Sequence, residues 1–273
     1  MSSPSSSNDA AKVHNRAAWS QLARQKQRFT RPARDEDFAD PLSLLDGSGW
    51  LAEGVRGKRL LCLAAGGGRH GPLYAAAGAD VTVVDISSAQ LELDREVAEQ
   101  RRLKIRTVET SMDELTMFDE GEFEIVAHPV STCYLPDLTV VYRQIARITR
   151  AGGLYVSQHK QPASLQAETH PTSDGAPTGY YVRQPYYRSG PLPEVQGSLH
   201  REAGTLEFLH RWEQLLGLMC RAGFVIEDLA EPLHADRQAA LGTFAHRSTY
   251  FAPYVRVKAR RRASEPRHSP IVF

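Results

Sequence analysis

The sequence predicts an α/β fold built on a doubly wound, mostly parallel seven-stranded sheet. From about residue 57 to residue 158, short apolar runs alternate with helical segments. This alternation is typical of parallel strands joined by crossover helices. A glycine-rich turn follows the first apolar run, and a carboxylate closes the second. A helical segment before the sheet predicts an N-terminal cap, and an irregular stretch after residue 160 predicts a lid insertion.

The composition excludes several classes of protein. The 273 residues are 41% hydrophobic and carry a formal net charge of +1, which is ordinary for a soluble domain. No apolar run approaches the roughly 20 residues of a membrane helix, and the N-terminus lacks the pattern of a signal peptide. Near-neutral charge gives no general attraction to nucleic acid. Three widely spaced cysteines favour a cytoplasmic protein without a disulfide framework.

The N-terminal 54 residues are expected to be a disordered tail followed by a helical cap. Residues before about Ala10 are rich in serine and proline, which favours disorder. An amphipathic helix is predicted over His14 to Arg28, with Trp19 on its apolar side. A short helix or turn is predicted over 42–51.

The main domain is predicted to span residues 55–259, followed by a flexible tail over 260–273. Its helices are expected over 69–78, 88–100, 137–150 and 206–222. Its strands are expected over 59–64, 81–85, 104–108, 123–127, 154–158, 224–226 and 250–259.

The predicted lid covers residues 160–204, which are rich in proline, glycine, serine, tyrosine and glutamine. A loop of this length without secondary structure is uncommon in a compact domain unless it binds a ligand or covers a site. Its four tyrosines combine an apolar ring with a polar tip, which suits an amphipathic acceptor; ordinary packing is the alternative. They are Tyr180, Tyr181, Tyr186 and Tyr187.

The turn between the first strand and helix predicts a nucleoside-containing cofactor. Glycines at 66, 67, 68 and 71 let the backbone approach a ligand closely, and the following helix offers free N–H groups. Asp85, at the tip of the second strand, can accept hydrogen bonds from a ribose diol. Taken alone, Gly66-x-Gly68-x-x-Gly71 also matches the dinucleotide fingerprint of NAD(P)-dependent oxidoreductases. That alternative, and a binding protein without catalysis, stay open at this point.

Five segments in order resemble the motifs of class I S-adenosylmethionine-dependent methyltransferases, over about residues 57–258. They are Leu61–Gly68, Val83–Ser87, Phe123–His128, Arg147–Leu154 and Ala222–Phe224. The resemblance implies a Rossmann-like sheet and S-adenosyl-L-methionine as cofactor. The chain departs from the family pattern at three positions. Cys62 stands where the family usually has an acidic residue, Ala64 where it usually has glycine, and Ser111 where it often has aspartate.

The resemblance also implies roles for single residues. The turn from Ala64 to Gly68 would contact the methionyl part, Asp85 the ribose, and His128 the sulfonium methyl. Ile86 would cover one adenine face, and Met112 would lie at the adenine edge. Arg69 and His70 could meet the cofactor carboxylate. The implied cofactor-binding set is Ala64, Ala65, Gly66, Gly68, Asp85, Ile86, Met112 and His128.

The predicted function is methyl transfer from this cofactor to a small-molecule acceptor. An activated sulfonium needs an aligned nucleophile more than a dedicated base, so catalytic candidates are few: His128, Tyr134 and His210, with His200 as a further base candidate. Trp19 could close over the cofactor or pack on the sheet. The residues after the fourth strand contain no cluster of acids that would bind a metal, so we expect a metal-independent reaction. We expect neither nucleic acid nor membrane as partner, and the apolar surface of the N-terminal helix could serve a homodimer.

Overall fold

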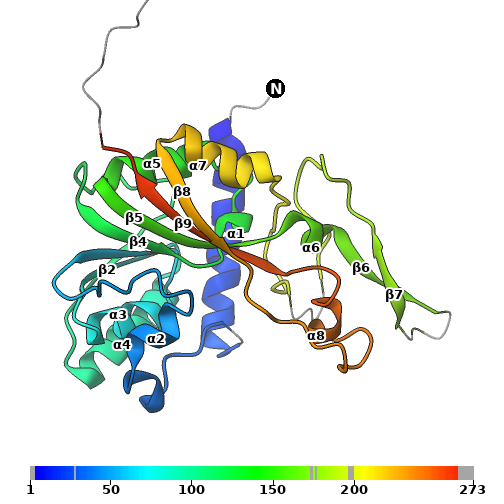
Figure 1. Ribbon diagram of the computed structural model, residues 1–273, viewed down its shortest axis with the longest axis horizontal. Helices are drawn as coiled ribbons and strands as arrows, with labels where there is room; N and C mark the ends of the chain where they lie inside the picture. The colour runs from blue at the N-terminus through cyan, green and yellow to red at the C-terminus, as the bar shows by residue number, and fades with distance from the viewer. Residues whose placement is uncertain (1–3, 28, 173–174, 176, 196–199, 264–273) are drawn as a thin grey trace, which may run out of the picture.

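The computed structural model describes residues 4–27, 29–172, 175, 177–195 and 200–263, and its centre is the predicted seven-stranded sheet. The strands follow the order β3-β2-β1-β4-β5-β9-β8, and only β9 runs antiparallel to its neighbours (Figure 1). Their bounds are β1 Arg59–Leu63, β2 Asp80–Asp85, β3 Ile105–Glu109, β4 Phe123–His128, β5 Thr149–Lys160, β8 Phe224–Ala230 and β9 Tyr254–Arg261.

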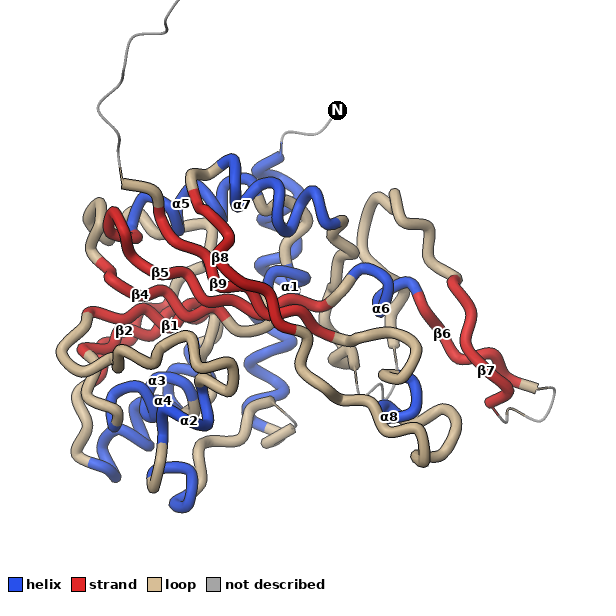
Figure 2. The backbone as a smooth tube through the Cα atoms, in the orientation of Figure 1, coloured by secondary structure: helices blue, strands red, loops and turns tan. Residues whose placement is uncertain are grey.

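Helices cover both faces of this sheet (Figure 2). The α2 (Pro41–Leu45), α3 (His70–Ala76) and α4 (Ser88–Arg101) helices lie on one face, and α5 (Thr139–Ile148) and α7 (Leu218–Arg221) lie on the other. Strand β1 shows why two layers are needed. Its side chains alternate, so Leu60 and Cys62 enter the core under α3, while Leu61 and Leu63 enter the core under α5. The doubly wound class that the alternation predicted is confirmed.

The strand order reverses at β1, which pairs in parallel with both β2 and β4. In open α/β sheets, ligands bind outside the carboxyl ends of the strands at such a reversal. The topology therefore directs attention to the residues that follow β1, β2 and β4.

The N-terminal helix α1 spans Pro4–Arg24, so the expected disorder before Ala10 is wrong from residue 4 onward. Two asparagines seven residues apart hold α1 against loops at the end of the sheet. Asn8 exchanges hydrogen bonds with the backbone of Asp137. Asn15 donates to the carbonyl oxygens of Tyr134 and Leu206 and accepts from Leu206 N. A serine-rich N-terminus is usually disordered unless it packs against the rest of the protein. The partners of Asn8 and Asn15 lie far away in the sequence, so local composition could not predict this packing.

The expected loop over 160–204 contains regular structure. Helix α6 (Pro162–Gln166) is followed by a hairpin of β6 (Ala167–Pro171) and β7 (Pro177–Val182), which projects beside the sheet (Figure 1). The prediction of a segment without secondary structure is wrong here. The backbone N–H and C=O groups of β6 and β7 form hydrogen bonds with each other across the hairpin. The short elements η1 (Asp35–Phe38), η2 (Thr132–Tyr134) and α8 (Phe244–Arg247) complete the fold.

The helix predicted over 206–222 is also partly wrong. Residues 205–211 run without helical structure, and the helical turn comprises η3 (Glu213–Gly217), a π-helical stretch, and α7. Glu207 points inward, where its carboxylate pairs with Lys160. The last strand begins at Tyr254 rather than 250 and ends at Arg261. The flexible tail predicted over 260–273 is wrong at residues 260 and 261, which belong to β9, and residues 264–273 lie outside the described residues.

Candidate active site

One cavity of about 640 Å³ opens at the carboxyl ends of β1, β2 and β4. Its volume is within the range of small-molecule sites. Every residue of the predicted cofactor set except Gly68 lines it. The cavity continues past these residues to a second wall formed by α1, the 44–50 loop and the start of β9. We call the part around β1, β2 and β4 the cofactor half and the rest the acceptor half.

The glycine turn has a shape that side chains would obstruct. A Cβ atom on Gly66 would lie 2.7 Å from Cβ of Gln90, and one on Gly68 would lie 2.8 Å from the carbonyl oxygen of Leu93. Helix α4 therefore packs directly on the turn. Ala64 begins the turn with φ of 48°, a left-handed conformation that suits glycine better than alanine. The departure noticed at this position in the sequence is thus a strained residue.

Asp85 joins the end of β2 to the glycine turn. Its Oδ2 accepts from Gly66 N over 3.0 Å, and its Oδ1 accepts from Ser87 N over 2.9 Å. Burial raises the pKa of Asp85 to about 6, and the backbone hydrogen bonds oppose that rise. An ionised carboxylate has about four acceptor positions, so the group can hold the turn and still accept from a diol in the cavity.

Two residues of α4 were missed from the sequence. Asp94 Oδ2 accepts from Gly67 N over 2.9 Å, and burial raises the pKa of Asp94 to about 7. Gln90 lines the cavity while fully buried, and its Oε1 has no hydrogen-bond partner within the described part of the chain. A buried acceptor without a partner is costly unless a ligand donates to it. Gln90 and Asp94 follow the Ser87 N-cap by three and seven residues, so they lie on one face of α4. This spacing could have predicted that both residues contact the glycine turn.

His128, at the end of β4, lies in a chain of hydrogen bonds. Ser131 Oγ donates to Met112 Sδ over 3.8 Å, so it accepts from His128 Nε2 over 2.5 Å. The Tyr155 hydroxyl then donates to His128 Nδ1 over 2.8 Å. Burial lowers the pKa of His128 to about 3, so the ring is neutral. This arrangement holds a neutral ring against the cavity, with both nitrogens engaged by the protein.

Tyr134 and Trp19 meet at the boundary between the two halves of the cavity. Their rings are in edge-to-face contact with centroids 5.4 Å apart, and both line the cavity. The Tyr134 hydroxyl donates to Glu202 over 2.6 Å. Burial raises the pKa of Tyr134 well above its ordinary value. Tyr134 is therefore a hydrogen-bond donor that ties the loop after β4 to the lid segment.

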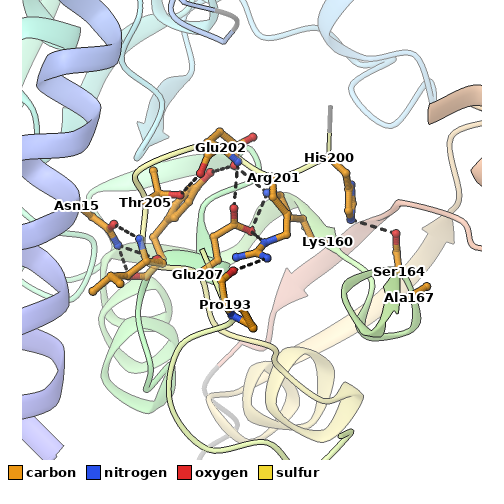
Figure 3. A network of polar contacts seen from close by, with 12 residues as sticks. Asn15, Lys160, Ser164, Ala167, Pro193, His200, Arg201, Glu202, Thr205 and Glu207 are labelled. Atoms are coloured by element: carbon orange, nitrogen blue, oxygen red, sulfur yellow. Dashed lines mark hydrogen bonds and ion pairs between the residues drawn. The ribbon is translucent and has the colours of Figure 1, made fainter. Parts of the chain in front are cut away.

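Glu202, the partner of Tyr134, belongs to a buried charge cluster (Figure 3). Lys160 Nζ contacts Glu202 over 2.8 Å and Glu207 over 2.9 Å, and Arg201 Nε lies 3.5 Å from Glu207. The side chains of Lys160 and Glu207 are 1% and 0% exposed. Two cations and two carboxylates balance each other, which makes so deep a burial tolerable. This cluster joins the end of β5 to residues 201–207.

Other candidates from the sequence lie away from the cavity. His210 Nε2 donates to the carbonyl oxygens of Thr132 and Leu135, and the residue is buried but does not line the cavity. His200 lies outside it too, within 3.0 Å of the Ser164 hydroxyl. Neither do the four lid tyrosines reach it; Tyr180 instead packs on His246.

Arg69 and His70 both line the cavity near the start of α3. Arg69 pairs with Asp37 over 3.0 Å, and burial lowers the pKa of His70 to about 4. Among the described residues, no three His, Cys, Asp or Glu side chains are grouped to hold a metal ion. In the same part of the chain, no helix has the length and apolar character needed to cross a membrane.

Comparison with known proteins identifies the family of the chain. Residues 61–157 match the family model of a methyltransferase domain. The protein named Uncharacterized methyltransferase YbaJ, from Bacillus subtilis, is 34% identical over 180 residues, which are 65% of this chain and 69% of that protein. A ubiquinone biosynthesis O-methyltransferase from Bordetella avium is 30% identical over 117 residues, 42% of this chain and 48% of that protein.

Among solved structures, the fold is similar to 1,6-didemethyltoxoflavin-N1-methyltransferase from Burkholderia thailandensis. The TM-score is 0.57 at 16% identity, covering 96% of this chain and 92% of that chain, and that structure contains S-adenosylhomocysteine. The chain belongs to the class I S-adenosylmethionine-dependent methyltransferases. These findings do not favour an NAD(P)-dependent oxidoreductase or a binding protein without catalysis.

The residues present fit the cofactor of this family. A glycine turn, a carboxylate with spare acceptor positions and the side chain of Gln90 all line one cavity. An adenosyl group bearing hydroxyls and an amino-acid end would match this set of groups.

Proposed function

We propose that this protein transfers a methyl group from S-adenosylmethionine to a small molecule held in the acceptor half of the cavity. The observation that carries the proposal is that the glycine turn, Asp85 and His128 open onto one cavity that extends beyond them. The extension leaves space for a second ligand next to the first.

Each predicted cofactor residue has a role in this proposal. The backbone from Ala64 to Gly68 holds the amino-acid end, with Gly68 acting through the turn rather than as a lining residue. Asp85 accepts from the ribose hydroxyls, and Gln90 Oε1 accepts from a further donor of the ligand. Ile86 and Met112 enclose the adenine ring.

The bound cofactor supplies a methyl group that is already activated by a positive sulfur. The chain then has to orient the acceptor and exclude water. We propose that His128 does this as a fixed neutral wall, because both ring nitrogens are occupied and its pKa is about 3. Tyr134 orients the acceptor side through its bond to Glu202. His210 acts at a distance by holding the loop after β4.

The cavity volume of about 640 Å³ favours a small acceptor over nucleic acid. The atom that is methylated differs between the relatives, since one is named an O-methyltransferase and one an N1-methyltransferase. We keep a metal-independent reaction, a cytoplasmic location and a homodimer as predictions. Size-exclusion chromatography with light scattering measures the last of these.

Thermal unfolding with S-adenosylhomocysteine, NAD or NADP tests the proposal. Only S-adenosylhomocysteine should raise the melting temperature, because ligands stabilise the folded state in proportion to their binding. Turnover is then followed as S-adenosylhomocysteine formed from a metabolite library. Stabilisation by the nicotinamide cofactors alone would overturn the proposal.

A further inference from the structure

The acceptor half of the cavity contains a cation that the proposed function leaves unused. Arg256 of β9 lines the cavity next to Gln158 of β5, its partner in the strand register. Arg256 Nε donates to Gln158 Oε1 over 2.9 Å. This bond fixes the guanidinium and leaves its terminal nitrogens to other partners. Among the described residues, no carboxylate oxygen lies within 4.0 Å of Arg256.

The acid of the 44–50 loop is already engaged. Asp46 Oδ1 accepts from Trp50 N over 2.8 Å, and Asp46 Oδ2 accepts from Leu51 N over 2.6 Å. Its carboxylate therefore holds the 44–50 loop in place. Arg256 also lines a neighbouring hollow with Asp228 and Glu231, whose carboxylates accept from Trp50 and Gln161. Among the described ion pairs, none includes Arg256.

The other cations of the cavity differ from Arg256. Lys12 lies 3.6 Å from Asp113, and Arg69 lies 3.0 Å from Asp37. Arg31 is exposed, and its neighbour Pro32 packs on Gly68 of the glycine turn. Arg31 thus belongs to the cofactor half, whereas Arg256 belongs to the acceptor half.

Two further donors lie beside Arg256. Gln158 Oε1 accepts from Arg256, and Gln158 Nε2 is a donor that makes no hydrogen bond to another described residue. Tyr74 lines the same wall. Burial raises the pKa of Tyr74, and the nearby charge of Arg256 opposes this rise without cancelling it. The Tyr74 hydroxyl therefore keeps its proton. A group of donors with one full positive charge matches a ligand group that only accepts.

The surface next to these donors is aromatic. The ring of His234 is in edge-to-face contact with Phe244 and with Tyr254, at 5.5 Å between centroids in both cases. All three line the cavity, as does Trp50, whose Nε1 donates to Asp228 over 2.8 Å. Fixed rings of this kind favour a flat apolar ligand body.

We infer that the methyl acceptor is a small carboxylic acid whose carboxylate binds Arg256, Gln158 and Tyr74. This inference rests on the proposed function. His128 pairs with Ser157, and Ser157 pairs with Val257, the neighbour of Arg256. The Cα atoms of His128 and Val257 are therefore two strand spacings, roughly 10 Å, apart. Gln158 and Arg256 are each one residue off this row, so their side chains point to the face of the sheet that α3 covers, and the carboxylate site lies there, away from His128.

Matched ligand pairs test the inference on the protein loaded with S-adenosylhomocysteine. Aryl and alkyl carboxylates are titrated calorimetrically beside the carboxamides of the same skeletons. At least one acid should bind about 10- to 100-fold more tightly than its amide, the usual effect of a hydrogen bond to a charged group. Arg256→Gln should remove this preference. Lys258→Gln, on the same strand and paired with Glu227, should keep it.

Two outcomes overturn the inference while leaving the proposed function intact. One is that S-adenosylhomocysteine binds but no acid in the panel exceeds its amide. The other is that the preference survives in Arg256→Gln with cofactor affinity unchanged. Loss of S-adenosylhomocysteine binding by the wild-type protein would instead contradict the proposed function itself.

Discussion

The two halves of the cavity are built in different ways. The cofactor half comes from neighbouring units of the chain, since β1, the glycine turn, β2 and α4 lie within residues 59–101 and β4 ends at His128. The acceptor half joins α1, the 44–50 loop, the ends of β5 and β9, and residues near 202 and 234. Local sequence can encode the first half. The second half exists only once distant segments have folded together.

This difference predicts that the halves can be damaged separately. The acceptor half depends on buried charges and long-range hydrogen bonds, whereas the cofactor half depends on backbone shape and one carboxylate. The predictions below test that separation, starting with the largest expected effect.

Removing the buried cation should affect the acceptor half most. Lys160→Met leaves Glu202 and Glu207 without their shared partner, and breaking a buried pair costs about 3–5 kcal/mol. Chemical denaturation measures this loss. The exposed control Lys104→Met should stay within about 0.5 kcal/mol. Binding of S-adenosylhomocysteine should persist in Lys160→Met below its unfolding transition; its loss there would show that the halves are not separable.

Removing the ribose carboxylate should affect the cofactor half alone. Asp85→Ala deletes the hydrogen bond from Gly66 N and those that we propose from the ribose hydroxyls, so affinity for S-adenosylhomocysteine should fall by at least about 100-fold. Calorimetric titration gives the number. Asp80→Ala, at the exposed start of the same strand, is the matched control. Equal affinities in Asp85→Ala and wild type would refute the assignment of Asp85.

Acid pH should weaken cofactor binding and stabilise the empty protein. Burial raises the pKa of Asp85 to about 6 and of Asp94 to about 7. Between their unfolded values and these raised values, the folded state binds more protons than the unfolded state. The carboxylates therefore destabilise the empty protein as pH rises through this window. In the proposed function the ionised form of Asp85 binds the ribose, so affinity should be several-fold weaker at about pH 5 than at about pH 8.

Titration calorimetry and denaturation across that pH range measure the two trends. In Asp85→Asn the contribution of Asp85 to both trends should vanish, leaving only that of Asp94. An affinity that rises on acidification would contradict the role given to Asp85.

The smallest expected effect concerns the first residue of the turn. Ala64 adopts φ of 48°, which costs roughly 1–2 kcal/mol for a residue with a Cβ atom. Glycine removes that cost but loses about 0.5–1 kcal/mol through greater freedom in the unfolded chain. Ala64→Gly should therefore stabilise the protein by about 0.5–1 kcal/mol and keep cofactor affinity. A destabilised variant would show that the methyl group contributes packing worth more than the strain.

The same division explains what the sequence could predict. The sheet could be predicted from the alternation of apolar runs and helical segments. The positions of Asp85 and the glycine turn could be predicted from the spacing of residues within single β–turn–α units. Gln90 and Asp94 were accessible through helical spacing but were missed. The docking of α1 by Asn8 and Asn15, and the pairing of Glu207 with Lys160, depend on partners far away in the chain. The helix predicted through Glu207 failed because a buried charge pair outweighed local helical propensity.

The central claim is that S-adenosylmethionine lies across the carboxyl ends of β1, β2 and β4. A crystal structure of the complex with S-adenosylhomocysteine tests it most directly. We predict ligand density in the cofactor half, with the ribose hydroxyls within hydrogen-bond distance of Asp85 and the sulfur facing His128 and the acceptor half. Density elsewhere on the protein, or a ribose held by groups other than Asp85, would contradict the account.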